Sequence, residues 1–256
     1  MIQPPGTILQ SMYFKERLPR IPPGKFVEVG AGRGFLSNSL LGLGWQGSAY
    51  ELNPDSIAVA ADVNRAAIDA GRFSLVRNDW LSVQGEDQVD LIVSSMVLEH
   101  LSDVDEHRYF ERCQRFLKPS GTGVLFVPGC PDYWGVEDEI AGHFRRYTFE
   151  GLRQRIEEGG LKVRHIAGLT YPVSNLLYPL SEHLVRRAER DKANLSLQER
   201  TRLSGNRTVR FKTSFPSLLK IVLNEFVMYP FHQLQKMNAG NDRSMVIYAE
   251  FSAATN

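Results

Sequence analysis

Three glycines spaced two residues apart follow a short apolar run and are well suited to binding a small ligand. Gly30, Gly32 and Gly34 come directly after the Phe-Val-Glu-Val run at residues 26–29, and the chain then becomes amphipathic. Without Cβ atoms, these positions can take positive φ and let the backbone approach a ligand closely. The free N–H groups at the start of the next helix point toward the same place. The pattern predicts a strand that runs into a turn for a nucleotide-like cofactor.

Further polar residues follow the later predicted strands. Glu51 closes the second strand, where a carboxylate can accept hydrogen bonds from both hydroxyls of a ribose. Asn78-Asp79-Trp80 follows the third strand, with an N-cap or turn role as the alternative for the aspartate. The dinucleotide pattern Gly-x-Gly-x-x-Gly would need a glycine where Phe35 stands, so the spacing disfavours NAD and FAD.

At these positions the chain resembles the class I S-adenosylmethionine-dependent methyltransferases, whose first motif reads acidic-x-Gly-x-Gly-x-Gly. The run from Gly142 to Thr148 resembles the Gly-His-x-Arg-Arg-Tyr-Thr segment of many small-molecule and lipid-directed members. The resemblance covers residues 10–168 and the last strand. It implies S-adenosylmethionine as the cofactor, with Asp79 at the adenine amine and Trp80 on its ring. The implied cofactor-binding residues are Glu28, Gly30, Ala31, Gly32, Gly34, Glu51, Leu52, Asn78, Asp79, Trp80, Ser95 and Met96.

Strands and helices alternate along the chain, which predicts a mostly parallel sheet with helices on both faces. The expected strands are one from about Lys25 and others at Gly47–Leu52, Phe73–Arg77, Val89–Ser95, Thr122–Val127, Leu161–Ile166 and Ser244–Phe251. The expected helices are Ser11–Leu18, Gly34–Leu43, Pro54–Ala70, Asp103–Leu117 and Thr148–Glu158. With the resemblance, this predicts an α/β fold: a Rossmann-like, doubly wound, seven-stranded, mostly parallel sheet with an antiparallel last strand.

Residues 169–243 break this alternation and are interpreted as a helical insertion that acts as a lid or binds substrate. The methyltransferase domain would then comprise residues 1–168 and 244–256. Between residues 181 and 224 the insertion has ten Lys or Arg against four Asp or Glu. Its aromatic residues near Lys220 and Lys236, which are Phe226, Tyr229 and Phe231, resemble an interfacial helix. Peripheral membrane contact is therefore one interpretation, and a lid packed on the sheet is the other.

Composition argues against several other classes of protein. The net charge is +1, without the positive field that nucleic-acid binding requires, so no nucleic-acid partner is expected. Cys113 and Cys130 are far apart and outside any CxxC spacing, so neither a disulfide framework nor a metal site is expected. The absence of a secretory leader pattern and of a long apolar segment makes the cytoplasm the expected location.

Methyl transfer from a sulfonium requires the acceptor atom, the methyl carbon and the sulfur to be aligned in a site shielded from water. A general base is needed when the acceptor atom carries a proton. His143 and His100 are the main candidates, and Glu99 and Tyr147 are lesser ones. His143 lies in the loop expected to cover the acceptor, and imidazole ionises near neutral pH. A structural role in the loop is the alternative.

Three side chains are predicted to contact the acceptor: Tyr13, Arg146 and Tyr147. Arg145 and Arg146 either clamp an anionic group of the acceptor or pair with the acidic residues 138–139 to hold the loop. Tyr13 either closes over the cofactor or docks its helix on the core.

The leading hypothesis is a methyltransferase that uses S-adenosylmethionine to methylate an oxygen or nitrogen atom of a small-molecule acceptor, such as a secondary metabolite. The second hypothesis is a methyltransferase whose acceptor is a lipid or lies at a membrane surface. The third is a catalytically inactive module that binds the cofactor or serves in protein interaction.

Overall fold

The chain is described by a computed structural model at residues 2–84, 88–188 and 215–254. It divides into two compact units. The sheet unit consists of Pro22–Val127, Phe149–Ile166 and Tyr248–Asn256, and the helical unit consists of Met1–Ile21, Pro128–Thr148 and Ala167–Ile247. The insertion predicted at 169–243 thus shares its compact unit with two other segments, and the predicted domain division stays a prediction.

Seven strands of the described residues form one sheet, in the order β3-β2-β1-β4-β5-β7-β6. The strands are β1 Lys25–Val29, β2 Gln46–Tyr50, β3 Phe73–Val76, β4 Val89–Ser95, β5 Leu117–Pro128, β6 Leu161–Leu169 and β7 Val246–Ala253. The pairs β1–β2, β1–β4, β2–β3 and β4–β5 are parallel. The prediction of a Rossmann-like, mostly parallel sheet with an antiparallel last strand is confirmed.

The central strands are apolar on both faces, as strands covered by helices must be. In β4, Val89, Leu91, Ile92 and Val93 are all buried, and the strand pairs with residues 26–29 of β1. The strand order reverses between β1 and β4. In sheets of this kind, ligands bind beyond the carboxyl ends of the strands at the point of reversal. The glycine turn after β1 therefore lies where a ligand is expected.

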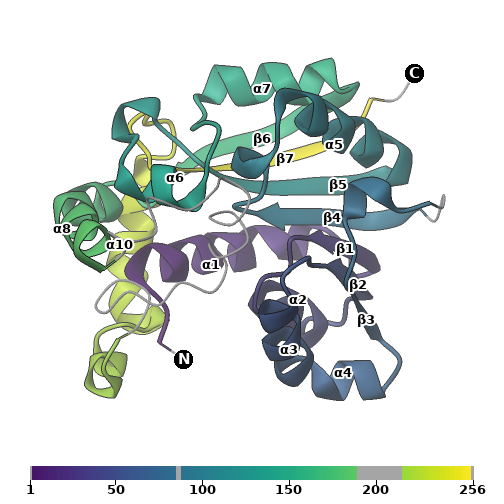
Figure 1. Ribbon diagram of the computed structural model, residues 1–256, viewed down its shortest axis with the longest axis horizontal. Helices are drawn as coiled ribbons and strands as arrows, with labels where there is room; N and C mark the ends of the chain where they lie inside the picture. Colours follow the sequence, from purple (N-terminus) through teal and green to yellow (C-terminus); the bar gives the residue numbers. More distant parts are fainter. Residues whose placement is uncertain (1, 85–87, 189–214, 255–256) are drawn as a thin grey trace. The chain divides into compact units, whose positions relative to one another are not determined.

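The described helices of the sheet unit connect these strands (Figure 1): α2 Phe35–Gly42, α3 Pro54–Val63, α4 Arg65–Asp69, α5 Asp103–Phe116 and α7 Phe149–Glu158. The short turns η2 Trp80–Ser82 and η3 Leu98–His100 follow β3 and β4. The prediction of one helix from Pro54 to Ala70 is wrong, because the helix is interrupted at Asn64. The side chain of Asn64 is buried and donates hydrogen bonds to the carbonyls of Gly34 at 3.0 Å and Ala60 at 2.9 Å.

The helical unit contains α1 Pro5–Arg17, η1 Leu18–Arg20, η4 Pro131–Tyr133, α6 Val136–Ala141, α8 Val173–Ala188, η6 Ser217–Ile221 and α10 Glu225–Met237. Helix α1 begins at Pro5 rather than at Ser11, because proline suits the first helical turn and because Ile8 and Leu9 extend the buried face. Residues 189–214, which include much of the basic stretch, lie outside the described residues. Among the described helices, none has the length and apolar character needed to cross a bilayer.

Candidate functional site

The glycine turn after β1 is built from three glycines that serve different purposes. All have positive φ: 76° at Gly30, 50° at Gly32 and 76° at Gly34. A Cβ at Gly30 would lie 2.4 Å from the side chain of Val97, and one at Gly34 would lie 2.8 Å from the Cβ of Ala60. A Cβ at Gly32 would meet no protein atom within 4 Å. Gly30 and Gly34 therefore serve close packing, whereas Gly32 leaves space beside the turn that a ligand can fill.

Glu51 holds this turn against the end of β2. Its Oε2 accepts a hydrogen bond from Gly32 N, and its Oε1 accepts from Leu52 N and Asn53 N, all at 2.8 Å. A carboxylate has about four lone-pair positions, so capacity for a ligand hydroxyl remains. The next side chain, Leu52, is 62% exposed. An acceptor carboxylate, an open glycine and an exposed leucine together fit the ribose and base of S-adenosylmethionine.

Glu28 lies beneath the turn and is buried. Ser37 of α2 donates a hydrogen bond to its carboxyl group. Burial raises the pKa of Glu28 to about 8, despite the opposing hydrogen bond from Ser37. Ala31 is also buried. Both residues shape the turn from inside the protein, and their predicted contacts with the cofactor stay predictions.

The segment after β3 separates into an exposed polar part and a buried aromatic part. Asn78 and Asp79 are exposed, and Asp79 Oδ1 caps η2 by accepting a hydrogen bond from Leu81 N at 2.9 Å. The alternative N-cap role of Asp79 is thus present, and its contact with adenine stays a prediction. Trp80 is buried in the protein core, and its predicted place on the adenine ring stays a prediction. Its ring lies 5 to 6 Å from three neighbours: Tyr109, Arg112 and Phe116.

The end of β4 carries the remaining predicted cofactor contacts, Ser95 and Met96. Both are half-buried. Met96 has φ 55°, and its N–H donates to the carbonyl of Phe126 on β5 at 2.8 Å. A non-glycine residue in this conformation stores strain that the surrounding contacts must hold, as is common at binding sites. Because β4 lies next to β1 in the sheet, these residues share an edge with the glycine turn.

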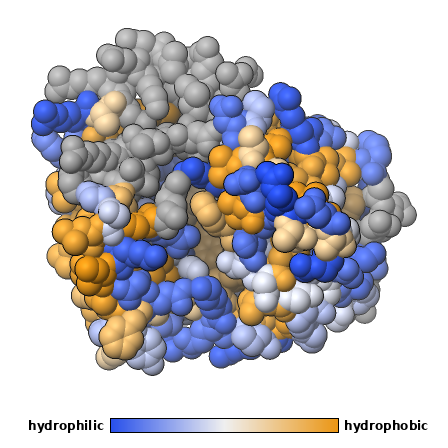
Figure 2. All heavy atoms as spheres, turned by 90° about the horizontal axis from the view of Figure 1, so that it is seen from below, coloured by the Kyte–Doolittle hydropathy of each residue, from blue (hydrophilic) through white to orange (hydrophobic). Residues whose placement is uncertain are grey.

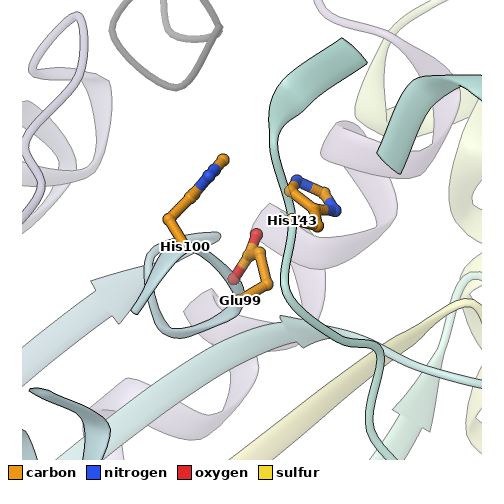
Figure 3. A group of neighbouring side chains, drawn as sticks. All are labelled: Glu99, His100 and His143. Atoms are coloured by element: carbon orange, nitrogen blue, oxygen red, sulfur yellow. The ribbon is translucent and has the colours of Figure 1, made fainter. Parts of the chain in front are cut away.

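The turn η3 brings Glu99 and His100 to the region just beyond β4. Figure 3 shows both side chains extending from this turn. Glu99 is buried and His100 is half-buried. His143, drawn in the same figure, belongs to the helical unit. Glu99 and His100 thus follow the strand end predicted to border the cofactor, and their predicted roles as bases stay predictions.

In the helical unit, His143 is paired with Asp138. The distance from His143 Nδ1 to Asp138 Oδ1 is 2.7 Å. Gly142 ends α6 in the left-handed conformation, with φ 75°, and His143 N donates to the carbonyl of Asp138 at 2.9 Å. This is the Schellman arrangement of a helix end, which turns the residue after the glycine back toward the last helical turn. The local backbone therefore places the imidazole beside the carboxylate.

Asp138 is fully buried and joins both ends of the loop. Its carboxylate accepts hydrogen bonds from Gly135 N at 3.0 Å and from Arg146 Nε at 2.9 Å, and Arg146 also donates to the carbonyl of Gly129. Burial acts to raise the pKa of Asp138, but the hydrogen bond with His143 and the charge of Arg146 outweigh it, so the pKa is lowered. Asp138 is therefore a carboxylate at neutral pH.

The three residues predicted to contact the acceptor all belong to the helical unit, where they interact with other residues of the protein. Arg146 is bound to Asp138, so its contacts support the loop-holding alternative rather than the acceptor clamp. Tyr147 is buried, and its backbone bonds to Pro128 and Cys130. Tyr13 is buried on α1, consistent with a docked helix. None of these contacts links the three residues to an acceptor, and their predicted substrate roles stay predictions.

Glu182 of α8 supports the segment that carries Asp138, and it was not identified from the sequence. Its carboxylate accepts hydrogen bonds from Val136 N at 2.9 Å and Glu137 N at 3.4 Å, at the start of α6. Carboxylates at this position satisfy N–H groups that a helix leaves unpaired. Helix α8 thus supports the segment that carries Asp138. No local sequence pattern indicates this contact, because 46 residues separate Glu182 from Val136.

The sheet and its glycine turn define an α/β protein that binds a nucleoside-type cofactor beyond the carboxyl ends of its strands. A family model described as a methyltransferase domain matches residues 11–166. Because this match covers more than half of the chain, the chain belongs to that methyltransferase family. It is an S-adenosylmethionine-dependent methyltransferase.

Solved structures of low sequence identity share this fold. The cyclase SpnF has TM-score 0.62 and 13% identity, over 96% of this chain and 80% of that chain. A candidate sarcosine dimethylglycine methyltransferase from Galdieria sulphuraria has TM-score 0.60 and 14% identity, over 96% and 85%. The glycopeptide N-methyltransferase MtfA in complex with S-adenosylmethionine has TM-score 0.55 and 14% identity, over 96% and 87%. No curated protein matches the chain in sequence.

Proposed function

We propose that the protein methylates an oxygen or nitrogen atom of a small-molecule acceptor, with His143 as the general base. The observation that carries this proposal is the 2.7 Å hydrogen bond between His143 Nδ1 and the buried carboxylate of Asp138. A hydroxyl or phenol must lose its proton as its oxygen attacks carbon, and a protonated amine must lose one beforehand to gain a lone pair. A histidine oriented by a carboxylate is suited to take that proton.

The charge of Asp138 defines which nitrogen of His143 is basic. Because the pKa of Asp138 is lowered, its carboxylate accepts the hydrogen bond, and the ring proton of neutral His143 lies on Nδ1. Nε2 then carries the lone pair. Protonation at Nε2 would produce an imidazolium that the carboxylate stabilises. Arg146 and Gly135 hold the carboxylate, so its orientation does not depend on His143 alone.

S-adenosylmethionine, when bound, supplies a methyl group on a positively charged sulfur. The residues that would hold it are in the sheet unit: Gly32 leaves open space, Glu51 would accept a hydrogen bond from the ribose and Leu52 would offer an apolar contact. Their task is to orient the donor, because an in-line transfer needs alignment rather than a protein nucleophile. The protein's own chemistry is therefore proton removal and positioning.

The names of two structural neighbours bear on the acceptor without identifying it. MtfA is named as an N-methyltransferase of a glycopeptide, which agrees with a nitrogen acceptor. SpnF is named as a cyclase, so the same fold also carries other chemistry. The decisive measurement is therefore methyl transfer itself.

The experiment measures S-adenosylhomocysteine release from S-adenosylmethionine with a panel of phenols and of primary and secondary amines. For an acceptor that is methylated, His143→Ala is expected to lower turnover by about 10²- to 10⁴-fold. Its affinity for S-adenosylhomocysteine, measured by calorimetry, should not change. His107→Ala is the matched control, because His107 is an exposed histidine on α5.

Unchanged turnover in His143→Ala would exclude the base role. Binding of S-adenosylhomocysteine together with no transfer to any compound of the panel would instead favour the inactive module. A role of Asp138 through His143 predicts that Asp138→Asn also lowers turnover and alters its dependence on pH.

A further inference from the structure

Helix α10 buries two polar side chains and exposes several large apolar ones. The buried residues are Met228, His232 and Gln235, at spacings of four and three. Met228 packs with Ile8 and Leu9 of α1. The opposite side carries exposed aromatic residues, whereas the exposed side of a helix docked on a core is usually polar.

Hydrogen bonds on the inner face determine the rotation of α10 about its axis. His232 Nε2 bonds to Glu16 of α1 at 2.9 Å, and Lys236 bonds to the same carboxylate at 2.7 Å. Gln235 Nε2 donates to the carbonyl of Leu9 at 2.9 Å, and its Oε1 accepts from Thr170 N at 2.9 Å. Turning the apolar side inward would break these bonds and leave buried polar groups unsatisfied, which costs about 1 to 3 kcal/mol per group.

The surface of the outer side of α10 and of the preceding turn η6 is rich in exposed apolar side chains. Phe226 is 90% exposed and Met237 is 84% exposed. We call this surface the outer apolar stripe; its members are Leu218, Ile221, Val222, Phe226, Tyr229, Phe231, Leu234 and Met237. Figure 2 shows apolar residues gathered at the left of the face, the side on which α10 lies in Figure 1. Apolar surfaces of this kind mark contact with a partner or a membrane.

Positive charge accompanies the stripe. Lys220 lies within η6, and Arg186 and Arg187 are exposed at the end of α8, in the same unit. Residues 181–224 have ten Lys or Arg against four Asp or Glu, an excess of +6 in a chain of net charge +1. Aromatic and aliphatic side chains bordered by basic residues are the pattern of a helix that lies in the interface of an anionic bilayer.

We propose that the outer apolar stripe docks this protein on an anionic lipid bilayer, with Phe226 and its neighbours entering the interface and Lys220 facing the headgroups. In a two-fold dimer the stripe would meet its own copy, which would bring Lys220 of both copies into one apolar interface. Anionic lipid neutralises that charge instead. The proposal concerns membrane binding and holds for any methyl acceptor.

The test is cosedimentation of the full chain with vesicles. One set is pure phosphatidylcholine, and the other contains about one-third phosphatidylserine, so that the sets differ in surface charge. The protein should pellet with the anionic vesicles much more than with the neutral ones, and raised salt should weaken the binding. Absence of binding to anionic vesicles, or equal binding to both sets, would overturn the proposal.

Substitutions in the stripe test where binding occurs. Phe226→Ser should weaken binding to anionic vesicles by about 10- to 100-fold, the range for withdrawing one large apolar side chain from the interface. Lys220→Glu should weaken it by about fivefold or more, through lost attraction to the headgroups. Val104→Ser is the matched control, because Val104 is a 62% exposed apolar residue of α5 in the sheet unit. It should bind like the unsubstituted protein.

The three variants should fold like the unsubstituted protein, because the side chains of Phe226, Lys220 and Val104 are exposed and their substitution leaves the core intact. Circular dichroism and thermal unfolding should match the unsubstituted protein. Equal vesicle binding by Phe226→Ser and the parent would refute the assignment of the stripe. Concentration-dependent dimerisation that Phe226→Ser abolishes, without vesicle binding, would assign the stripe to a second copy of the chain.

Discussion

Alanine substitutions at three glycines can distinguish an effect on cofactor affinity from an effect on the stability of the fold. Gly32 and Gly44 both have positive φ, and a Cβ at either would meet no protein atom within 4 Å. At Gly34, a Cβ would lie 2.6 Å from the side chain of Asn64 and 2.9 Å from the backbone of Ala60. The three alanine variants therefore differ in what the added methyl touches.

The backbone sets a common cost for all three variants. An alanine in the left-handed region is disfavoured by about 1 to 2 kcal/mol relative to glycine. Gly32→Ala and Gly44→Ala should each lower the free energy of unfolding by this amount. Gly34→Ala adds an overpacking cost of about 1 to 3 kcal/mol, because Asn64 and the backbone of Ala60 must move. Urea denaturation should therefore rank Gly34→Ala as the least stable.

Cofactor affinity should rank the variants differently. The methyl of Gly32→Ala would enter the space assigned to S-adenosylmethionine, and an overpacking cost of about 1 to 3 kcal/mol corresponds to about 5- to 150-fold in Kd. Gly44→Ala lies outside the turn and should bind S-adenosylhomocysteine normally in calorimetry. If Gly32→Ala binds with unchanged affinity while losing the same stability as Gly44→Ala, the turn is not the cofactor site.

Three further predictions test the roles of carboxylates. Burial raises the pKa of Glu28 to about 8, so its contribution to stability is full below the pKa of the unfolded chain and is lost as pH rises toward 8. Urea denaturation should show the parent losing about 1 kcal/mol per pH unit relative to Glu28→Gln over that range. Glu51→Ala should weaken S-adenosylhomocysteine binding by about 1.5 to 3 kcal/mol in calorimetry, and a near-zero effect would place the ribose elsewhere. Glu182→Ala removes the acceptor at the start of α6 and should lower the free energy of unfolding by about 1 kcal/mol. Unchanged thermal and urea unfolding would mean that this contact contributes nothing.

Local sequence signals were sufficient for most of the sheet. Strand β4 spans the predicted Val89–Ser95, because an apolar run with clear ends is enough to define a buried strand. Strand β5 begins five residues before the expected Thr122, although Pro119 and Gly121 read as a turn. Pairing of Leu117 with Val89, with a shift of register before the next pair, supports the extension. Such a pairing depends on a neighbouring strand and is invisible in a local pattern.

The helix interruption at Asn64 and the position of Trp80 have the same kind of cause. Asn64 stops α3 because Gly34, 30 residues earlier, presents a carbonyl to its side chain. Trp80 follows a cofactor-type Asn-Asp pair, yet Tyr109 and Phe116 of α5 draw its ring into the core. The type of residue was informative in both positions. The partner came from a distant element in both cases, so the packing of these side chains could not be predicted from the neighbouring residues.

The sequence identifies both His143 and Asp138 as residues of interest, but it does not show that they form a pair. The histidine was recognisable as a candidate base, and Asp138 was recognisable as a partner for the following arginines. Their relation depends on Gly142, which reverses the chain so that residues five apart meet. It depends equally on Arg146, because the charge of this guanidinium helps a fully buried Asp138 to stay ionised. Replacing Arg146 by methionine should therefore weaken the hydrogen bond between Asp138 and His143 and change the pH dependence of turnover. If Arg146 instead bound an anionic group of the acceptor, the same replacement would change KM alone.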